Sequence, residues 1–140
     1  MARRDVFMII VDSNIYIFSE SESAPERSVA IQKLKDASIK DRIGTNVIVM
    51  SEVYHHVRRF TGLEGATLRV ADILNSPLVD FLDFRPETIV RATKLARDFQ
   101  MRINDALIAQ QAIELGAAVL TDNIRDFGKI KSLKIIPLRS

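Results

Sequence analysis

The 140-residue sequence contains no cysteine and no apolar stretch long enough to cross a bilayer. The absence of cysteine excludes disulfide bonds and thiolate metal sites, and it is typical of proteins of the cytoplasm. The longest apolar run, residues 6–11, has the length of a strand, whereas a membrane helix needs roughly 20 residues. Arg3 and Arg4 precede too short an apolar segment for a secretion signal. We therefore expect a cytoplasmic protein without a membrane segment.

The sequence also lacks internal repeats, linkers and low-complexity tracts, so we expect one domain over residues 1–140. Basic residues number 20 and acidic residues 18, which gives a formal net charge of +2. That balance permits binding to nucleic acid but does not argue for it. Function therefore has to be inferred from individual positions.

Strands and helices alternate along the sequence. Residues 6–11 and 117–120 are continuous apolar runs, typical of strands buried on both faces of a parallel sheet. Shorter strands are predicted at 43–45, at 135–136 and, at or near a sheet edge, at 79–84. Helices are predicted in between, beginning near residue 15 and then over 23–37, 46–62, 66–75, 86–99 and 104–115. This alternation predicts an α/β fold with a parallel sheet and helices on both faces.

Local signals predict where several helices begin and end. Ser23 and Glu26 have the spacing of a capping box, and Asn46 and Asn104 are favoured residues for a helix N-cap. Gly116 can adopt the left-handed conformation that ends a helix.

Acidic residues stand at the points where the predicted strands end. Asp12 follows the first strand, Asp122 and Asp126 follow the strand at 117–120, and Asp105 lies in the first turn of a helix. Ligands of open α/β sheets bind at the carboxyl ends of the strands, so these acids are expected to converge there. Glu52 lies near the start of another helix and is a further candidate.

Clustered carboxylates repel one another and need either protons or a cation. The only histidines are the adjacent pair His55 and His56, so oxygen ligands dominate and Mg²⁺ or Mn²⁺ is the expected ion. Such ions activate water for attack at phosphorus, which makes phosphodiester hydrolysis the natural reaction class.

Three segments give the sequence a resemblance to a known family. They are VDSNIYIF at 11–18, SEVYHHVRR at 51–59, and NDALIAQQAIELGAAVLTDNIRDF at 104–127 followed by KIIPL. In order and spacing they resemble PIN-domain ribonucleases, and within these the VapC-like toxins of prokaryotic toxin–antitoxin pairs. The resemblance implies a metal-dependent endoribonuclease in which Asp12, Glu52 and Asp105 hold the metal.

The identity of the fourth acid is left open by the resemblance. Asp126 matches the family's Asp-Phe acid and is favoured, but Asn123 occupies a position that is often Asp. Asp122 is therefore kept as an alternative metal ligand. Ser13, Asn14 and Asn123 are secondary candidates for the site.

The resemblance also implies partners: RNA, a second copy of the chain and an antitoxin protein. Arg58, Arg59, Arg125 and Lys129 are candidate phosphate contacts, although the basic C-terminal run could equally be a solvated face. A segment with an unclear place in the strand–helix alternation carries much apolar surface, which a dimer would cover. Its apolar residues are Phe60, Leu63, Leu68, Val70, Ile73 and Leu74.

Other interpretations of the acids remain. Asp12 alone could cap a helix, Asp105 could serve the helix dipole, and Glu52 could pair with an arginine on its own helix. A non-catalytic PIN fold that binds RNA or protein is the main alternative. A phosphatase using Asp12 as nucleophile is less favoured, because Asn14 stands where an Asp-x-Asp signature needs its second acid.

Overall fold

The computed structural model describes residues 7–139 and contains a five-stranded, wholly parallel sheet. Its strand order is β3-β2-β1-β4-β5. The strands are β1 (Met8–Val11), β2 (Arg42–Thr45), β3 (Val79–Phe81), β4 (Ala118–Thr121) and β5 (Lys134–Pro137). The predicted fold class is thus confirmed, and the predicted edge position of β3 is correct. Val6, predicted to start the first strand, lies outside the described residues.

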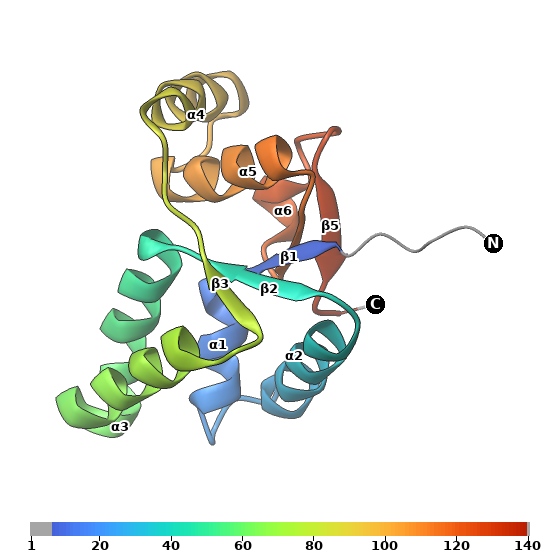
Figure 1. Ribbon diagram of the computed structural model, residues 1–140. Helices are drawn as coiled ribbons and strands as arrows, with labels where there is room; N and C mark the ends of the chain where they lie inside the picture. Colours follow the sequence, from blue (N-terminus) through green and yellow to red (C-terminus); the bar gives the residue numbers. More distant parts are fainter. Residues whose placement is uncertain (1–6, 140) are drawn as a thin grey trace.

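Six helices flank this sheet. They are α1 (Ser13–Glu20), α2 (Arg27–Lys40), α3 (Val47–Asn75), α4 (Pro86–Phe99), α5 (Ile103–Leu115) and the single turn α6 (Ile124–Phe127). Helices α1, α2 and α3 lie on one side of the sheet and α4 and α5 on the other, with α4 packed on α5 (Figure 1). Within residues 7–139 no helix has the length and apolarity needed to cross a membrane.

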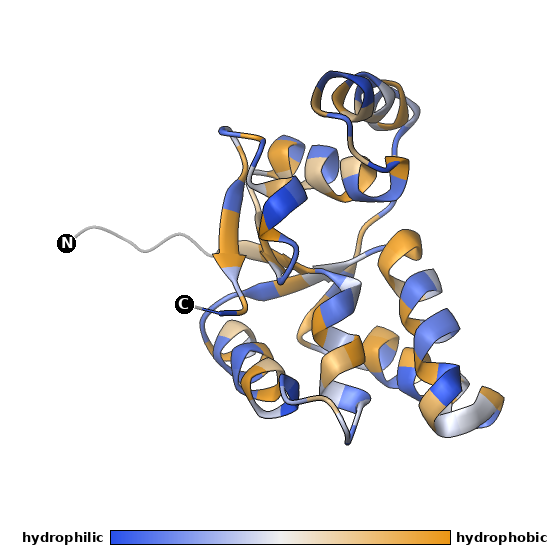
Figure 2. Ribbon diagram, turned by 180° about the vertical axis from the view of Figure 1, so that it is seen from behind, coloured by the Kyte–Doolittle hydropathy of each residue, from blue (hydrophilic) through white to orange (hydrophobic). Residues whose placement is uncertain are grey.

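The two central strands explain why the sequence shows continuous apolar runs. Strand β1 pairs with both β2 and β4, so neither of its edges is free, and helices lie on both sides of the sheet (Figure 1). Ile10, Val11, Val119 and Leu120 are accordingly almost wholly buried. The helices instead carry alternating hydrophilic and hydrophobic bands (Figure 2), as expected of elements that bury only one side.

The predicted capping box at Ser23 and Glu26 is wrong. Helix α2 begins at Arg27, and Glu26 before it has helical backbone angles and makes no side-chain capping bond. The Glu26 carboxylate pairs instead with Arg139, at 2.8 Å. A partner far away in the sequence has therefore displaced the local capping interaction.

The two predicted asparagine caps had different outcomes. Asn46 caps α3, because its side-chain oxygen accepts a hydrogen bond from the Val49 amide at 2.9 Å. Asn104 does not cap α5, which begins one residue earlier, at Ile103. Gly116 ends α5 in the left-handed conformation, as predicted.

Helix α3 is broken at Gly62, where the sequence predicted two helices. Gly62 has φ 76° and ψ 178°, a backbone conformation that is essentially restricted to glycine. The chain changes direction here, so the two halves of α3 form an arm beside α1 (Figure 1).

Replacing Gly62 by alanine should therefore destabilise the protein by about 1–3 kcal/mol. Because no neighbouring atom would contact the added Cβ, the cost comes from the backbone alone. Gly116→Asn is the matched control, since asparagine tolerates the left-handed conformation and should cost less. Urea unfolding measures both variants; an equal cost would contradict the described break.

Candidate active site

Asp12 is the most buried acid of the candidate site, with only 4% of its surface exposed. It follows β1 directly and caps α1. Its carboxylate accepts hydrogen bonds from the Ser13 amide at 2.8 Å, the Thr121 hydroxyl at 2.7 Å and the Asn14 side chain at 3.2 Å. All of these donors are neutral, so the hydrogen bonds orient the carboxylate without cancelling its charge.

Glu52 and Asp105 lie close to Asp12, although they come from α3 and α5. The Ser13 hydroxyl donates to Glu52 Oε1 at 3.2 Å, which links the start of α1 to α3. Burial raises the pKa of Asp12 to about 6, and the charges of Asp105 and Glu52 act in the same direction. These three predicted site residues are therefore brought together.

Asp105 connects this group to Asp126. Burial raises the pKa of Asp105, and Glu52 and Asp126 also raise it, while Arg102 acts in the opposite direction. Asp105 is 9% exposed and lies in the first turn of α5, as predicted. The acids of β1, α3, α5 and α6 thus form one electrostatically coupled cluster.

Asp126 is held by the residue that caps its helix. Asn123 accepts a hydrogen bond from the Asp126 amide at 3.4 Å and donates to its carboxylate at 3.2 Å. Lys129 lies 3.5 Å from the same carboxylate and also donates to the Phe99 carbonyl. Of the four residues predicted to contact RNA, Lys129 is thus the one that forms an ion pair with an acid of the cluster.

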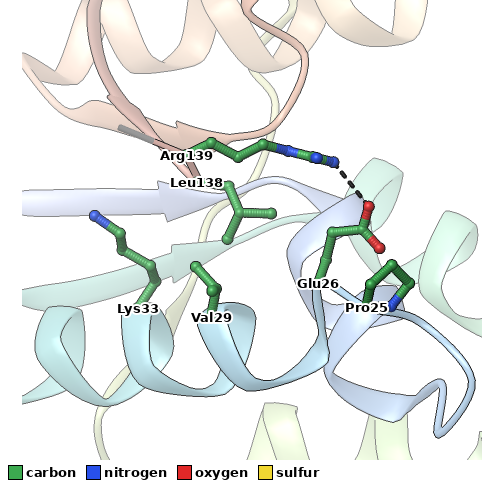
Figure 3. Close-up of a pocket in the computed structure, with 6 residues that line it drawn as sticks. All are labelled: Pro25, Glu26, Val29, Lys33, Leu138 and Arg139. Atoms are coloured by element: carbon green, nitrogen blue, oxygen red, sulfur yellow. Dashed lines mark hydrogen bonds and ion pairs between the residues drawn. The ribbon is translucent and has the colours of Figure 1, made fainter.

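Asp122 binds a residue outside this cluster, Arg139. Both of its carboxylate oxygens accept from the Arg139 guanidinium, at 3.0 and 2.9 Å. Arg139 also binds Glu26, beside a surface pocket lined by Val29, Lys33 and Leu138 (Figure 3). None of the four clustered acids lines this pocket. This geometry favours Asp126 over Asp122 as the fourth acid of the cluster.

The residues fit a hard divalent cation by their donor chemistry. Carboxylate oxygens dominate the cluster, and Mg²⁺ keeps several of its waters, so it needs few protein ligands. Across residues 7–139, no group of three or more acidic or histidine side chains is placed so that it could hold a metal ion as the side chains stand. The acids therefore interact electrostatically without being arranged around a shared ion position.

Basic residues are exposed on the two helices that carry Glu52 and Asp126. They are Arg58 and Arg59 on α3 and Arg125 on α6. Partial burial lowers the pKa of His56, as do His55 and Arg59, whereas Glu52 opposes them. His56 thus lies within electrostatic range of both Glu52 and Arg59.

Sequence reasoning missed two residues of the site, Thr121 and Arg102. The Thr121 hydroxyl donates to Asp12, and its oxygen accepts from the Asn123 amide at 2.9 Å. Its place at the end of a buried strand was a usable signal. Arg102 precedes α5 and lowers the pKa of Asp105, but an exposed arginine before a helix carries no comparable signal.

The PIN domain family model matches residues 9–133, so the chain belongs to the PIN domain family. The resemblance inferred from the three motifs is thereby confirmed at the level of the family. No curated protein sequence matches the chain.

Solved structures of toxin–antitoxin proteins share the fold. A chain of VapBC2 from Rickettsia felis, bound to a DNA fragment from its promoter, is 20% identical, with a TM-score of 0.74, and the match covers 94% of this chain and 98% of that one. A chain of DNA-bound VapBC from Salmonella typhimurium is 17% identical over 95% and 99%, with a TM-score of 0.73. VapC20 from Mycobacterium tuberculosis, a sarcin–ricin loop cleaving toxin, is 18% identical over 86% and 93%, with a TM-score of 0.69.

The raised pKa of Asp12 predicts a specific pH dependence for Asp12→Asn. The native carboxyl binds a proton more tightly than the unfolded one, so wild-type stability falls as pH rises from about 4 to about 6. The variant has no such loss. Its stability relative to wild type should therefore improve by up to about 3 kcal/mol over this range.

Urea unfolding at several pH values, with EDTA present, measures this difference. Asp80→Asn is the control, because Arg42 lowers the pKa of Asp80 and no gain should appear between pH 4 and 7. A difference between wild type and Asp12→Asn that does not change with pH would contradict the described environment of Asp12.

Proposed function

We propose that this protein is a metal-dependent endoribonuclease that hydrolyses RNA phosphodiester bonds, and that it is the toxin of a toxin–antitoxin pair. The observation that carries the proposal is the electrostatic coupling of four acids from separate elements: Glu52 and Asp105 act on the buried Asp12, and Asp126 acts on Asp105. A cluster of this kind is costly for folding unless a cation compensates it. Carboxylates with pKa values perturbed in this way are found most often at functional sites, where the loss of stability serves binding or catalysis.

In this proposal Asp12, Asp105 and Asp126 hold Mg²⁺ or Mn²⁺, and Glu52 either contacts the ion or orients a water. When bound, the ion supplies an activated water and positive charge for the phosphate undergoing attack. Thr121, Ser13 and Asn14 fix the Asp12 carboxylate through their hydrogen bonds.

The Ser13 hydroxyl serves the site in a second way, because its hydrogen bond to Glu52 holds that side chain toward Asp12. Arg58, Arg59 and Arg125, exposed on the helices that carry Glu52 and Asp126, would contact phosphates of the RNA backbone. Lys129 would act beside them, where it also limits repulsion at Asp126.

The fold relatives support the biological part of the proposal. Two of the structures contain VapBC complexes on DNA, and VapC20 is described as cleaving the sarcin–ricin loop. We infer by analogy an antitoxin protein as partner, RNA as substrate and the cytoplasm as location. A second copy of the chain is the remaining inferred partner.

The nuclease proposal predicts that some of the acids are needed for RNA cleavage and that Asp122 is not. Asp105→Asn and Asp126→Asn should lower cleavage of a labelled RNA panel by at least about a hundredfold, because each removes a charge that would face the ion. Asp122→Asn should keep its activity, since Asp122 is bound by Arg139. Mg²⁺ or Mn²⁺ should be required, and EDTA should abolish cleavage.

Two results would contradict this assignment of roles to the acids. Loss of activity in Asp122→Asn with full activity in Asp126→Asn would reverse the assignment of the fourth acid. RNA binding by the wild type, without cleavage in either metal, would favour the non-catalytic binding module.

The inferred homodimer rests on the arm formed by α3. Phe60, Leu63, Leu68 and Leu74 are 43–61% exposed there, whereas Val70 and Ile73 pack toward the core. Leu68→Glu should place a charge in the interface and shift the protein toward a monomer of 15.8 kDa.

Sedimentation at micromolar protein measures this shift. Val90→Glu is the control, because Val90 is 69% exposed on α4, away from the arm. A wild-type protein that is monomeric, or a Leu68→Glu variant that stays dimeric, would contradict this interface.

A further inference from the structure

Two buried side-chain amides join the helices that carry Glu52 and Asp105. Asn46, immediately before α3, is fully buried, and Gln111 in α5 is 4% exposed. Asn46 Nδ2 donates a hydrogen bond to Gln111 Oε1 at 2.8 Å, across 65 residues of sequence. A hydrogen bond of this kind between distant elements is specific, because a buried amide without a partner is costly.

The other polar atoms of the pair are also bonded. Asn46 Oδ1 accepts from the Val49 amide in the first turn of α3, at 2.9 Å. Gln111 Nε2 donates to the Asp83 carbonyl, in the segment that leads from β3 to α4, at 3.3 Å. The pair therefore fixes the start of α3 relative to α5 and to that segment.

Helices α3 and α5 have a reason to move apart. Their acids, Glu52 and Asp105, carry charges of the same sign and lie within electrostatic range of each other, so they repel. Over residues 7–139, no other side-chain hydrogen bond and no ion pair joins α3 to α5. The amide pair therefore links the two helices without adding any charge of its own.

We propose that Asn46 and Gln111 are positioning residues that set the separation of α3 and α5, and through it the separation of Glu52 and Asp105. The inference rests on the proposed function, because a fixed separation matters for holding a cation between the two acids. Asn46 and Gln111 touch neither acid and act only through the helices.

Two variants remove the amide pair in different ways. Gln111→Met keeps the volume of the side chain but loses both of its hydrogen bonds. Asn46→Ser keeps an oxygen that can cap α3 but loses the donor to Gln111. If one of these variants fails to fold, the other still tests the proposal.

Thr88→Val is the matched control. Thr88 is 3% exposed, and its hydroxyl donates to Glu114, so it joins α4 to α5 and makes no bond to α3. The control therefore loses a partly buried hydrogen bond of α5, at the end of the helix away from Asp105. A loss of stability alone should affect all three variants alike.

The first measurement is the separation of the two helices without metal. The chain has no cysteine, so His55→Cys on α3 and Leu115→Cys on α5 provide two unique positions for spin labels. In EDTA, with unlabelled protein added to dilute contacts between copies, the amide variants should give a broader or longer distance distribution than the parent. Thr88→Val should not change it.

The second measurement is Mn²⁺ binding by calorimetry. Both amide variants should bind Mn²⁺ about tenfold more weakly, as expected when the support of a metal site is loosened. Thr88→Val should bind it like wild type. An unchanged distance distribution in both amide variants, or equal weakening in Thr88→Val, would overturn the positioning role.

Failure of the proposed function gives a different pattern. If the wild type neither binds Mn²⁺ nor cleaves RNA, the metal site is refuted, while the distance measurement still decides whether the amide pair sets the helix separation.

Discussion

The structure depends on the burial of one negative charge at the end of its central strand. Asp12 is surrounded by neutral hydrogen-bond donors, and the nearest interacting charges, those of Asp105 and Glu52, are of the same sign. Burial and repulsion together raise the pKa of Asp12 to about 6. A carboxylate in this position needs a proton or a cation, and the oxygen atoms around it suit a divalent ion.

Basic side chains pair with some of the acids at this end of the sheet and not with others. Asp122 is paired with Arg139 and Asp126 with Lys129, whereas Asp12 has only neutral hydrogen-bond partners in the part of the chain that the structure describes. Arg102 offsets part of the repulsion at Asp105. Among the described residues, Asp12 and Glu52 are thus acids of the cluster without an ion-pair partner, and the proposed ion would compensate them.

Much of this architecture could be predicted from local patterns. The continuous apolar runs of β1 and β4 indicated central parallel strands, and the rule that ligands bind at strand ends placed Asp12 and Asp105 at one site. The N-cap at Asn46 and the end of α5 at Gly116 could equally be predicted, because each depends on the few residues next to it.

Several points that the sequence left wrong or open share one physical cause, which is pairing between residues far apart in the sequence. Glu26 was predicted to form a capping box with Ser23 but binds Arg139, and the choice between Asp122 and Asp126 depends on that same arginine. The hydroxyl of Thr121 reaches Asp12 only after β1 and β4 have paired. Sequence spacing describes neighbours within an element, and these contacts form between elements.

The central claim, that the acid cluster is a divalent-cation site, is tested most directly by thermal unfolding at increasing Mn²⁺ concentration. A ligand that binds only the native state stabilises it by about 2.7 kcal/mol at a hundred times its Kd. The account predicts a saturable rise of the wild-type Tm that is lost in Asp12→Asn. A wild-type Tm that does not respond to Mn²⁺, or an equal rise in Asp12→Asn, would contradict it.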